Sequence, residues 1–522
     1  MRSPARVLVA AALAVMVALA AAATTAGAAD TGNPSTADST ESTGRGDAPK
    51  GVQTFTYALG PLDIHPGQNV IETSQYRIPQ PTEDGWIVGF RPDLRLKDGT
   101  TPPVDRVHLH HGVWVNGAAL DRTAVLPERF FAAGEEKTFL EFPPGYGYQY
   151  STSDYWFLNY MIHNLTANPY TLSIVYEVDF LPATARQAAG MTPASPVWMD
   201  VQNGGFYPVF DVFKGTGTDG GFVYPDDDPG AYLGGPPKNE WTVDRPGTLV
   251  HTFGHLHPGG LSVDLWLRRA GESAAAGSDA AKSVEGDTAR LFSSTAKYYE
   301  PAGAVSWDVS MRATRPDWAV AVQPGDVLRL TATYDTSRAS WYESMGLAIV
   351  WMADGDTSGD DPFTTRVDRK GVLTHGHLPE NDNHGGKATE LADPRRAANG
   401  TSTSLVEMAE FFYSVGDLTD DAPLPTVPQG GSITFENLDA DAINVWHSVT
   451  ACKAPCTKST GIAYPLADAD VQFDSGQLGN AGAPTAGRLS WSTPTDLNPG
   501  TYTYFCRVHP FMRGAFRVTV SP

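Results

Sequence analysis

The sequence predicts an all-β protein built from several β-sandwiches. Gly (52) and Pro (40) are abundant and aromatic residues reach 10% of the chain, a mixture typical of many short strands joined by turns. Runs such as YTLSIVYEVDFL combine β-branched and aromatic residues in the lengths of strands, whereas no segment sustains the 3.6-residue period of an amphipathic helix. Only 18% of residues are charged, which argues against long charged helices and coiled coils.

The overall charge excludes one large class of function. The 522 residues carry a net charge of −22, and a protein that binds nucleic acid needs a basic face for the phosphates. We therefore expect no nucleic-acid partner. After the N-terminal segment, no apolar stretch reaches the length that crosses a bilayer, so we expect no transmembrane segment in the mature chain.

Residues 1–28 have the three parts of a secretory signal peptide. Arg2 and Arg6 precede an apolar run over residues 7–23, and Ala26-Gly27-Ala28 supplies the small-residue cleavage site. An uncleaved membrane anchor is the alternative. We expect cleavage, and a mature protein that is secreted, either extracellular or at the cell surface.

The rest of the chain divides by composition into five segments. Residues 29–50 are rich in Ser, Thr, Gly and Asp and predict a disordered linker. Strand-like runs over 51–187 and 188–355 predict two consecutive β-sandwiches. Residues 356–403 are polar and contain histidines, and we expect a second linker there. Residues 404–522 return to strand-like runs and predict a third sandwich.

The third sandwich carries a specific ligand pattern. His447 follows the run INVW, and Cys506, His509 and Met512 lie together in CRVHPFM. A thiolate, two imidazoles and a thioether are the donor set of a blue-copper site, because soft sulfur favours Cu(I) while imidazole suits Cu(II). Residues 404–522 resemble the cupredoxins, and the loop is most similar to that of plastocyanin and amicyanin. The resemblance implies a Greek-key β-sandwich that binds one type 1 copper.

The remaining two cysteines stand four residues apart in the loop after the first ligand. The chain has three cysteines, so in an exported protein at least one is not paired in a disulfide within the chain. Cys506 is that cysteine if it binds copper. We predict a disulfide between Cys452 and Cys456 that braces this loop.

A second set of histidines lies upstream. His255 and His257 stand two apart in GHLHPGG, so on a strand both side chains point to one face and can hold one ion. His110 and His111 are adjacent in HLHHGVW. His163, in a strand-like run, and Met345, at the start of another, complete the set.

The order His-His, His, His-x-His, Met resembles the copper type II ascorbate-dependent monooxygenases, the peptidylglycine α-hydroxylating and dopamine β-monooxygenase family. The resemblance spans residues 60–355 and implies two consecutive sandwiches that each hold one type 2-like copper. It assigns an electron-storing site to His110, His111 and His163. It assigns the catalytic, oxygen-binding site to His255, His257 and Met345.

The first of these sites has an alternative set of ligands. Adjacent residues on a regular strand point to opposite faces, so His110 and His111 share an ion only at a bulge or bend. Plain strand geometry pairs His108 with His110 instead. We take the family pair as the prediction and His108 as its alternative.

The residues around the second site differ from those of peptide-amidating relatives. Phe253, Leu347 and Ile349 stand where those relatives carry Arg, Asn and Tyr. A peptide carboxylate therefore has no clamp, and the substrate is unknown.

A further candidate metal group lies in THGHLPENDNHGG, which contains His375, His377 and His384. The H-x-H spacing again allows two imidazoles to hold one ion. The alternatives are a hydrated linker and a hydrogen-bonded patch between domains.

Together these patterns predict an exported multicopper oxidoreductase with one type 1 and two type 2-like coppers. We expect a monooxygenase that hydroxylates a C–H bond with O2, with the cupredoxin delivering electrons over a flexible segment 356–403. Its partners would be O2, an external reductant (ascorbate-like or a redox protein) and an unknown organic substrate. The alternative is a non-catalytic secreted protein that binds or buffers copper or transfers electrons.

Overall fold

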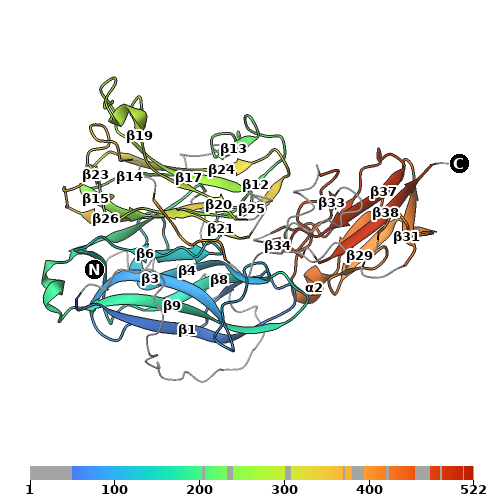
Figure 1. Cartoon of the computed structure of the whole chain (residues 1–522), viewed down its shortest axis with the longest axis horizontal. Coiled ribbons are helices and arrows are strands. Elements are labelled where there is room, and N and C mark those ends of the chain that lie inside the picture. The colour runs from blue at the N-terminus through green and yellow to red at the C-terminus, as the bar shows by residue number, and fades with distance from the viewer. Residues whose placement is uncertain are drawn as a thin grey trace, which may run out of the picture.

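The protein consists of three β-sandwiches, of which the first two are stacked and the third lies at their side, as the computed structural model shows (Figure 1). The prediction of an all-β fold is confirmed. The predicted signal peptide lies outside the described residues, and so does all but the last residue of the linker after it. The structure describes residues 50–202, 206–231, 239–299, 307–367, 371–378, 393–418, 422–452, 471–482, 485–509 and 511–520.

The first sandwich pairs a six-stranded sheet with a four-stranded sheet. The larger sheet has the order β1-β9-β3-β7-β10, with β6 beside β3, and the smaller has the order β2-β8-β4-β5. Their bounds are β1 (Gln53–Ile64), β2 (Ile71–Thr73), β3 (Gly85–Leu96), β4 (Val107–Leu120), β5 (Pro127–Gly134), β6 (Leu140–Glu141), β7 (Tyr146–Tyr150), β8 (Trp156–Asn164), β9 (Tyr170–Pro182) and β10 (Thr192–Pro193).

The second sandwich pairs a five-stranded sheet (β11-β26-β15-β23, with β16 beside β26) with a six-stranded sheet (β13-β24-β17-β19-β18, with β14 beside β24). Three short pairs, β12–β25, β20–β21 and β22–β27, extend it. The bounds are β11 (Ser195–Asp200), β12 (Phe210–Val212), β13 (Gly221–Tyr224), β14 (Glu240–Thr242), β15 (Gly247–Thr252), β16 (His255–Leu256), β17 (Gly260–Arg268), β18 (Val284–Glu285), β19 (Thr288–Thr295), β20 (Lys297–Tyr298), β21 (Val309–Ser310), β22 (Arg312–Ala313), β23 (Val320–Val322), β24 (Val327–Asp335), β25 (Trp341–Ser344), β26 (Gly346–Asp354) and β27 (Val372–Leu373).

The third sandwich has the sheets β28-β31-β38-β37-β33 and β30-β29-β32-β36, and a short β34–β35 pair. The bounds are β28 (Asn399–Ser402), β29 (Leu405–Ala409), β30 (Phe412–Tyr413), β31 (Leu424–Pro428), β32 (Thr434–Asn437), β33 (Thr450–Cys452), β34 (Ala481–Gly482), β35 (Thr485–Ala486), β36 (Ser490–Ser492), β37 (Gly500–Phe505) and β38 (Arg513–Thr519). The helices in the described part of the chain are short: η1 (Arg186–Gly190), η2 (Ala280–Lys282) and α2 (Asp439–Ile443).

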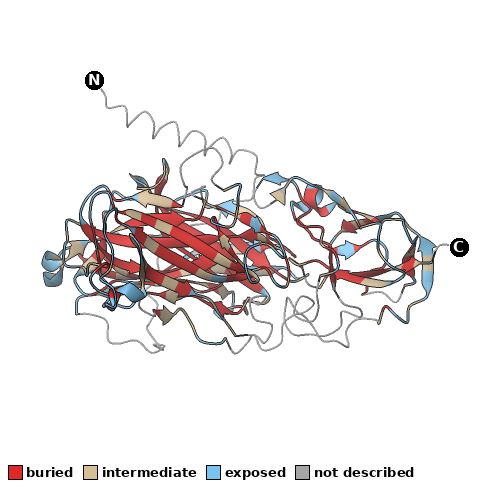
Figure 2. Ribbon diagram, turned by 90° about the horizontal axis from the view of Figure 1, so that it is seen from above, coloured by how far each residue is buried: buried red, intermediate tan, exposed pale blue. Residues whose placement is uncertain are grey.

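The first two sandwiches pack face to face, and β26 lies at their interface. Its sequence GLAIVWMAD is almost wholly apolar because both of its faces are buried. Figure 2 shows that buried residues dominate the strands of these two sandwiches. Alternate side chains enter different cores. Leu347, Ile349 and Trp351 join the core of the first sandwich. Their neighbours Ala348 and Val350 join the core of the second. One strand thus holds two domains in a fixed relation.

The segment expected to be a linker, 356–403, is corrected at both ends. Phe363 and Val367 are buried in the core of the second sandwich, and β27 pairs with β22. At the other end β28 pairs in parallel with β31 of the third sandwich. The segment is polar on average, but it contains these two apolar side chains. Their burial stabilises its packing against the core.

No helix in the described part of the chain has the length and apolar character needed to span a membrane.

Arg129 joins the first sandwich to the second. Its guanidinium bonds to Asp121 (Nε–Oδ2 2.8 Å), both side chains are almost fully buried, and it stacks 4.3 Å from the ring of Trp198 in β11. We expect Arg129→Met to reduce the free energy of unfolding by about 3–5 kcal/mol, because the Asp121 charge is left buried without its partner.

Chemical denaturation followed by circular dichroism measures this loss. The matched control is Arg245→Met, whose pair with Asp244 is half exposed (53% and 57% side-chain exposure). We expect the control to change stability by less than about 1 kcal/mol. Equal losses in the two variants would contradict the role of Arg129.

Candidate metal centres

Three buried side chains of the third sandwich converge on one point. His447 follows α2, Cys506 follows β37, and His509 lies in the turn before β38. The two Nδ1 atoms are 3.0 Å apart, and the Cys506 Sγ lies 3.7 Å from that of His447 and 3.6 Å from that of His509. The centre of such a triangle is roughly 2 Å from each corner, the length of a metal–imidazole bond. The three atoms therefore form a trigonal ligand set.

Hydrogen bonds on the far side of each ring aim the two imidazoles. The His447 Nε2 lies 2.9 Å from Asp439 Oδ2, and the His509 Nε2 lies 2.9 Å from the carbonyl oxygen of Gly67. Because each acceptor takes the Nε2 proton, each Nδ1 presents its lone pair to the common centre. Such outer partners fix the tautomer and orientation of metal-ligating histidines.

The sulfur of Cys506 is in the form that binds metal. Burial alone would raise the pKa of this thiol, but the neighbouring His509 and His447 outweigh burial and hold the pKa well below its usual range. The Ser448 N–H also points at the sulfur, 3.4 Å away. A thiolate is the species that ligates metals.

Met512 closes the same loop. Its backbone N–H donates to the His509 carbonyl (2.8 Å), and its carbonyl accepts the Cys506 N–H (3.1 Å). Its side chain is buried in the same core as Cys506. Thiolate, two imidazoles and a nearby thioether fit a copper ion of the blue type.

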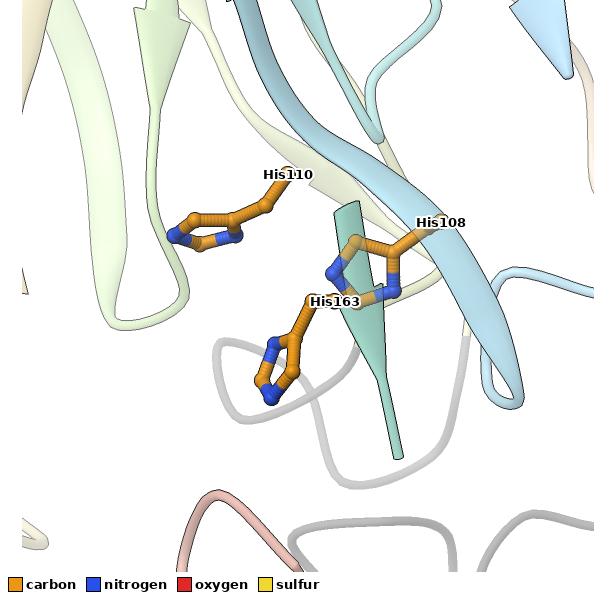
Figure 3. Close-up of side chains that lie close together, drawn as sticks. All are labelled: His108, His110 and His163. Carbon is orange, nitrogen blue, oxygen red and sulfur yellow. The ribbon is translucent and has the colours of Figure 1, made fainter. Parts of the chain in front are cut away.

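A second group of ligands lies in the first sandwich. His108 and His110 on β4 and His163 on β8 place ligand atoms within 4.8 Å of one another, and their rings gather around one small space (Figure 3). All three are buried, with 2–3% exposure. The Nδ1 of His108 lies 2.6 Å from the Val104 carbonyl, which leaves its Nε2 without a partner.

The structure corrects the predicted ligand set here, because His108 and not His111 joins His110 and His163. His108 pairs directly with His163 across the two strands, and the register shifts between Leu109 and His111, so His110 is the extra residue of a bulge. His110 nevertheless lies on the side of His108, as residues two apart on a strand do. His111 pairs with Met161, on the same face of β8 as His163, but its ring packs 4.5 Å from that of Tyr207 and is not part of the group.

These imidazoles are neutral and have few partners of their own. Burial lowers the pKa of His108 to about 4 and of His111 to about 3, and lowers those of His110 and His163 well below the usual value. Both ring nitrogens of His163 and the Nε2 of His108 are buried without a hydrogen-bond partner. Each such atom costs about 1–3 kcal/mol unless something binds it. A metal ion satisfies this requirement, so the residues fit one.

His255 and His257 face the same region from the second sandwich. The His255 Nδ1 lies 2.9 Å from Glu136 Oε2, and the His257 Nδ1 is hydrogen-bonded to the Glu343 carbonyl, so the Nε2 atoms of both rings are buried and unpartnered. The His257 ring lies 4.1 Å from that of His110. The two histidine groups, predicted as separate sites, are therefore in contact.

His111 and Met345 border this second group. The ring of His111 packs 4.5 Å from the ring of Tyr207. Met345 is buried and precedes Gly346, which pairs with Leu256 between the two histidines. The Tyr334 hydroxyl holds the Met345 backbone at its N–H (2.9 Å) and at its carbonyl (2.6 Å).

Several residues that contact the two histidine groups belong to no motif in the sequence. Glu135 lies 3.8 Å from the His110 Nδ1, and Glu136 bonds to His255. Trp307 packs against His108 (4.5 Å) and His163 (5.4 Å). The consecutive glutamates directly after a buried strand, in FFAAGEEK, were the one signal in the sequence.

The described part of the third histidine cluster is engaged in hydrogen bonds. Both ring nitrogens of His375 contact backbone carbonyls, at 2.6 and 2.8 Å, and the His377 Nδ1 lies 2.6 Å from Asp308. The contacts of His375 and His377 match the hydrogen-bonded patch weighed as an alternative. His384 lies outside the described residues.

The predicted disulfide also falls beyond what the structure describes. Cys456 lies outside the described residues, and only the backbone of Cys452, in β33, is described.

A small hollow lies beside the first group. His108, Leu109 and Glu135 are among its inner lining, and Lys137 and Asp93 pair at it (2.8 Å).

Comparisons with known proteins give local likenesses only. No family model and no curated protein matches the chain. Among solved structures, a purple cupredoxin from Nitrosopumilus maritimus is 20% identical; the match covers 23% of this chain and 99% of that one, with a TM-score of 0.15.

Two further solved structures show similar values. A Cu(I) form of an amicyanin mutant is 22% identical over 27% of this chain and 95% of that one (TM-score 0.15). A copper-containing nitrite reductase from Thermus scotoductus is 12% identical over 54% of this chain and 59% of that one (TM-score 0.15). At these TM-scores the ligand geometry above, and not the likeness, identifies the sites.

The corrected ligand set makes a direct prediction. We expect His108→Ala to remove one copper per chain and its type 2 signal in electron paramagnetic resonance (EPR), because a ligand of the first group is lost. His111→Ala should leave that signal in place, and both variants should keep the blue absorption. Copper analysis with EPR measures this. Loss of the first-group signal in His111→Ala alone would restore the family pair.

Proposed function

We propose that this chain is an exported multicopper oxidoreductase, a monooxygenase that hydroxylates a C–H bond of an organic substrate with O2 and receives electrons through its own cupredoxin site. One observation supports internal electron delivery above all others. His509, a ligand of the cupredoxin site, is fully buried and is hydrogen-bonded to Gly67 of the first sandwich. Its ring centre lies 6.4 Å from that of His163 in the first histidine group.

The contact supports an enzyme over a freestanding electron carrier. A carrier must show its ligand edge to an external partner, whereas here the first sandwich covers that edge. Phe411 packs tightly on Gly67, and the Arg507 guanidinium in the copper loop lies 5.1 Å from the ring of Trp341 in the second sandwich. The cupredoxin is thus docked at the junction of both sandwiches. This docking replaces the flexible tether expected from the sequence.

Copper, when bound, would supply one-electron transfer at the thiolate site and at the His108 group, and O2 chemistry at the His255 group. The protein's own part is to aim the imidazoles and to exclude water. Asp439 and Gly67 orient the rings at the thiolate site, and Glu136 and the Glu343 carbonyl orient those of the His255 group.

The reaction also fixes which partners are needed. Insertion of one oxygen atom of O2 into a C–H bond, with the other released as water, consumes two electrons and two protons. An external reductant, ascorbate-like or a redox protein, must therefore supply both electrons. The substrate remains an unidentified organic molecule.

A non-catalytic copper-binding or electron-transfer protein is the second candidate. Phe253, Leu347 and Ile349 are buried in the hydrophobic core and offer no polar group to a substrate. A scaffold that stores or relays copper needs no such group. Persistent absence of reductant- and copper-dependent oxygen uptake across a broad substrate screen would favour this candidate.

Met345 tests the catalytic assignment. We expect Met345→Ala to lose oxygen uptake coupled to substrate hydroxylation while keeping the blue absorption, because a thioether stabilises the Cu(I) state that O2 requires. Met191→Ala, a half-buried methionine beside Gly147, is the control and should keep activity. Full activity in Met345→Ala would show that the thioether has no catalytic role.

Gly67 tests the internal delivery of electrons. It has φ +61°, and a Cβ there would lie 1.9 Å from Phe411. We expect Gly67→Ala to displace the loop from His509. In single-turnover stopped flow, recovery of the blue band after mixing reduced protein with O2 should slow by about tenfold or more, equivalent to about 1.4 kcal/mol. Gly145→Ala adds similar backbone strain (φ +89°) with nothing within 4 Å, and is the control. Equal rates in both variants would contradict docked delivery.

A further inference from the structure

A buried hydrogen bond crosses from the first sandwich to a histidine of the second. Glu136 lies in the turn after β5, and its Oε2 is 2.9 Å from the Nδ1 of His255 in β16. The glutamate side chain is 0% exposed and the histidine side chain 2%. The bond therefore joins two domains within their common interior, where water does not compete for either partner.

The carboxylate of Glu136 is held in one orientation. Its other oxygen, Oε1, accepts the Gly134 N–H (3.0 Å) and the Thr138 hydroxyl (2.6 Å). With two donors fixed on Oε1, only Oε2 faces His255. The acceptor is thus positioned by the first sandwich alone, before the histidine arrives.

This arrangement selects one tautomer of the imidazole. A carboxylate oxygen can only accept, so the proton of His255 resides on Nδ1 and the lone pair on Nε2. That Nε2 is buried without a partner, as is the Nε2 of His257, whose Nδ1 is hydrogen-bonded to the Glu343 carbonyl. Both rings of the H-x-H pair therefore present a free Nε2 lone pair.

The preceding residue, Glu135, reaches the other histidine group. Its carboxylate lies 3.8 Å from the His110 Nδ1, and the His110 ring lies 4.1 Å from that of His257. One turn of the first sandwich thus contacts a histidine of each group.

We propose that Glu136 is a positioning residue for the metal site of His255 and His257, and that through it metal affinity in the second sandwich depends on docking against the first. The proposal rests on the proposed function, which places a metal at these two histidines. By linkage, a metal held there strengthens the contact between the two sandwiches by the same free energy by which docking strengthens metal binding.

The substitution Glu136→Gln tests the tautomer directly. The amide oxygen of glutamine must take the place of Oε1 to accept from Gly134, so its NH2 group faces His255. The His255 Nδ1 then has to accept a hydrogen bond, which moves the ring proton to Nε2 and blocks ligation. Glu141→Gln, at an exposed position of β6, removes the same charge and is the matched control.

The experiment titrates copper into the full chain against a competing chelator and records EPR at each step. We expect Glu136→Gln to weaken the copper of the His255 group by about 10–100-fold, the usual cost of losing an outer-shell partner. Its EPR hyperfine coupling should change, and the blue absorption and the control variant should match the wild type. An unchanged second copper in Glu136→Gln would overturn the inference and leave the proposed function intact.

A second variant separates positioning from general damage to the fold. In a His255→Ala background, adding Glu136→Gln should change copper affinity no further, because the residue acts only through His255. An additional loss in the double variant would overturn the inference. A wild type that binds the blue copper alone would instead overturn the proposed function, and this inference with it.

Discussion

Burial of imidazoles without hydrogen-bond partners is the constraint on which the rest of this structure depends. His163 is almost fully buried with both ring nitrogens unpaired, and His108, His255 and His257 each leave Nε2 unpaired. Burial lowers the pKa of His108, His110, His163 and His257, so protonation offers no relief. Bound metal is the partner that suits neutral imidazole.

The three sandwiches meet where the ligands are. β26 contributes alternate side chains to two cores, and Glu136 bonds across the same interface to His255. The copper loop of the third sandwich then docks through His509 on Gly67 and Arg507 on Trp341. Because each ligand group is oriented by a residue of a neighbouring element or domain, domain packing and metal binding reinforce each other. A separated cupredoxin would lose the acceptor that orients its own His509.

The sequence predicted those ligands that are close in the chain or on one strand. Cys506, His509 and Met512 share one loop, and His255 and His257 follow the two-residue period of a strand, so spacing alone assigns them. His108 and His110 follow the same two-residue period, although the register shift between Leu109 and His111, set by pairing with β8, is not revealed by the residues of β4. The resemblance to a monooxygenase family named a neighbour of His110 that lies outside the cluster of rings, while plain strand geometry named the neighbour within it.

The sequence could not predict the contacts between residues far apart in the chain that orient the ligands. Gly67 is 442 residues from His509 in sequence, and Glu136 is 119 from His255. The prediction of a linker over 356–403 was wrong because it relied on the average polarity of the segment. Two buried apolar residues, Phe363 and Val367, change that average very little. The signal peptide, the disulfide and the role of His384 remain predictions.

Quantitative EPR with copper analysis on the mature, copper-loaded protein tests the central claim most directly. The account predicts one blue-copper signal and about two further coppers per chain, held by the two histidine groups in the joined sandwiches. One copper per chain with a blue signal alone would contradict it, because the buried, unpartnered imidazoles would then hold no metal.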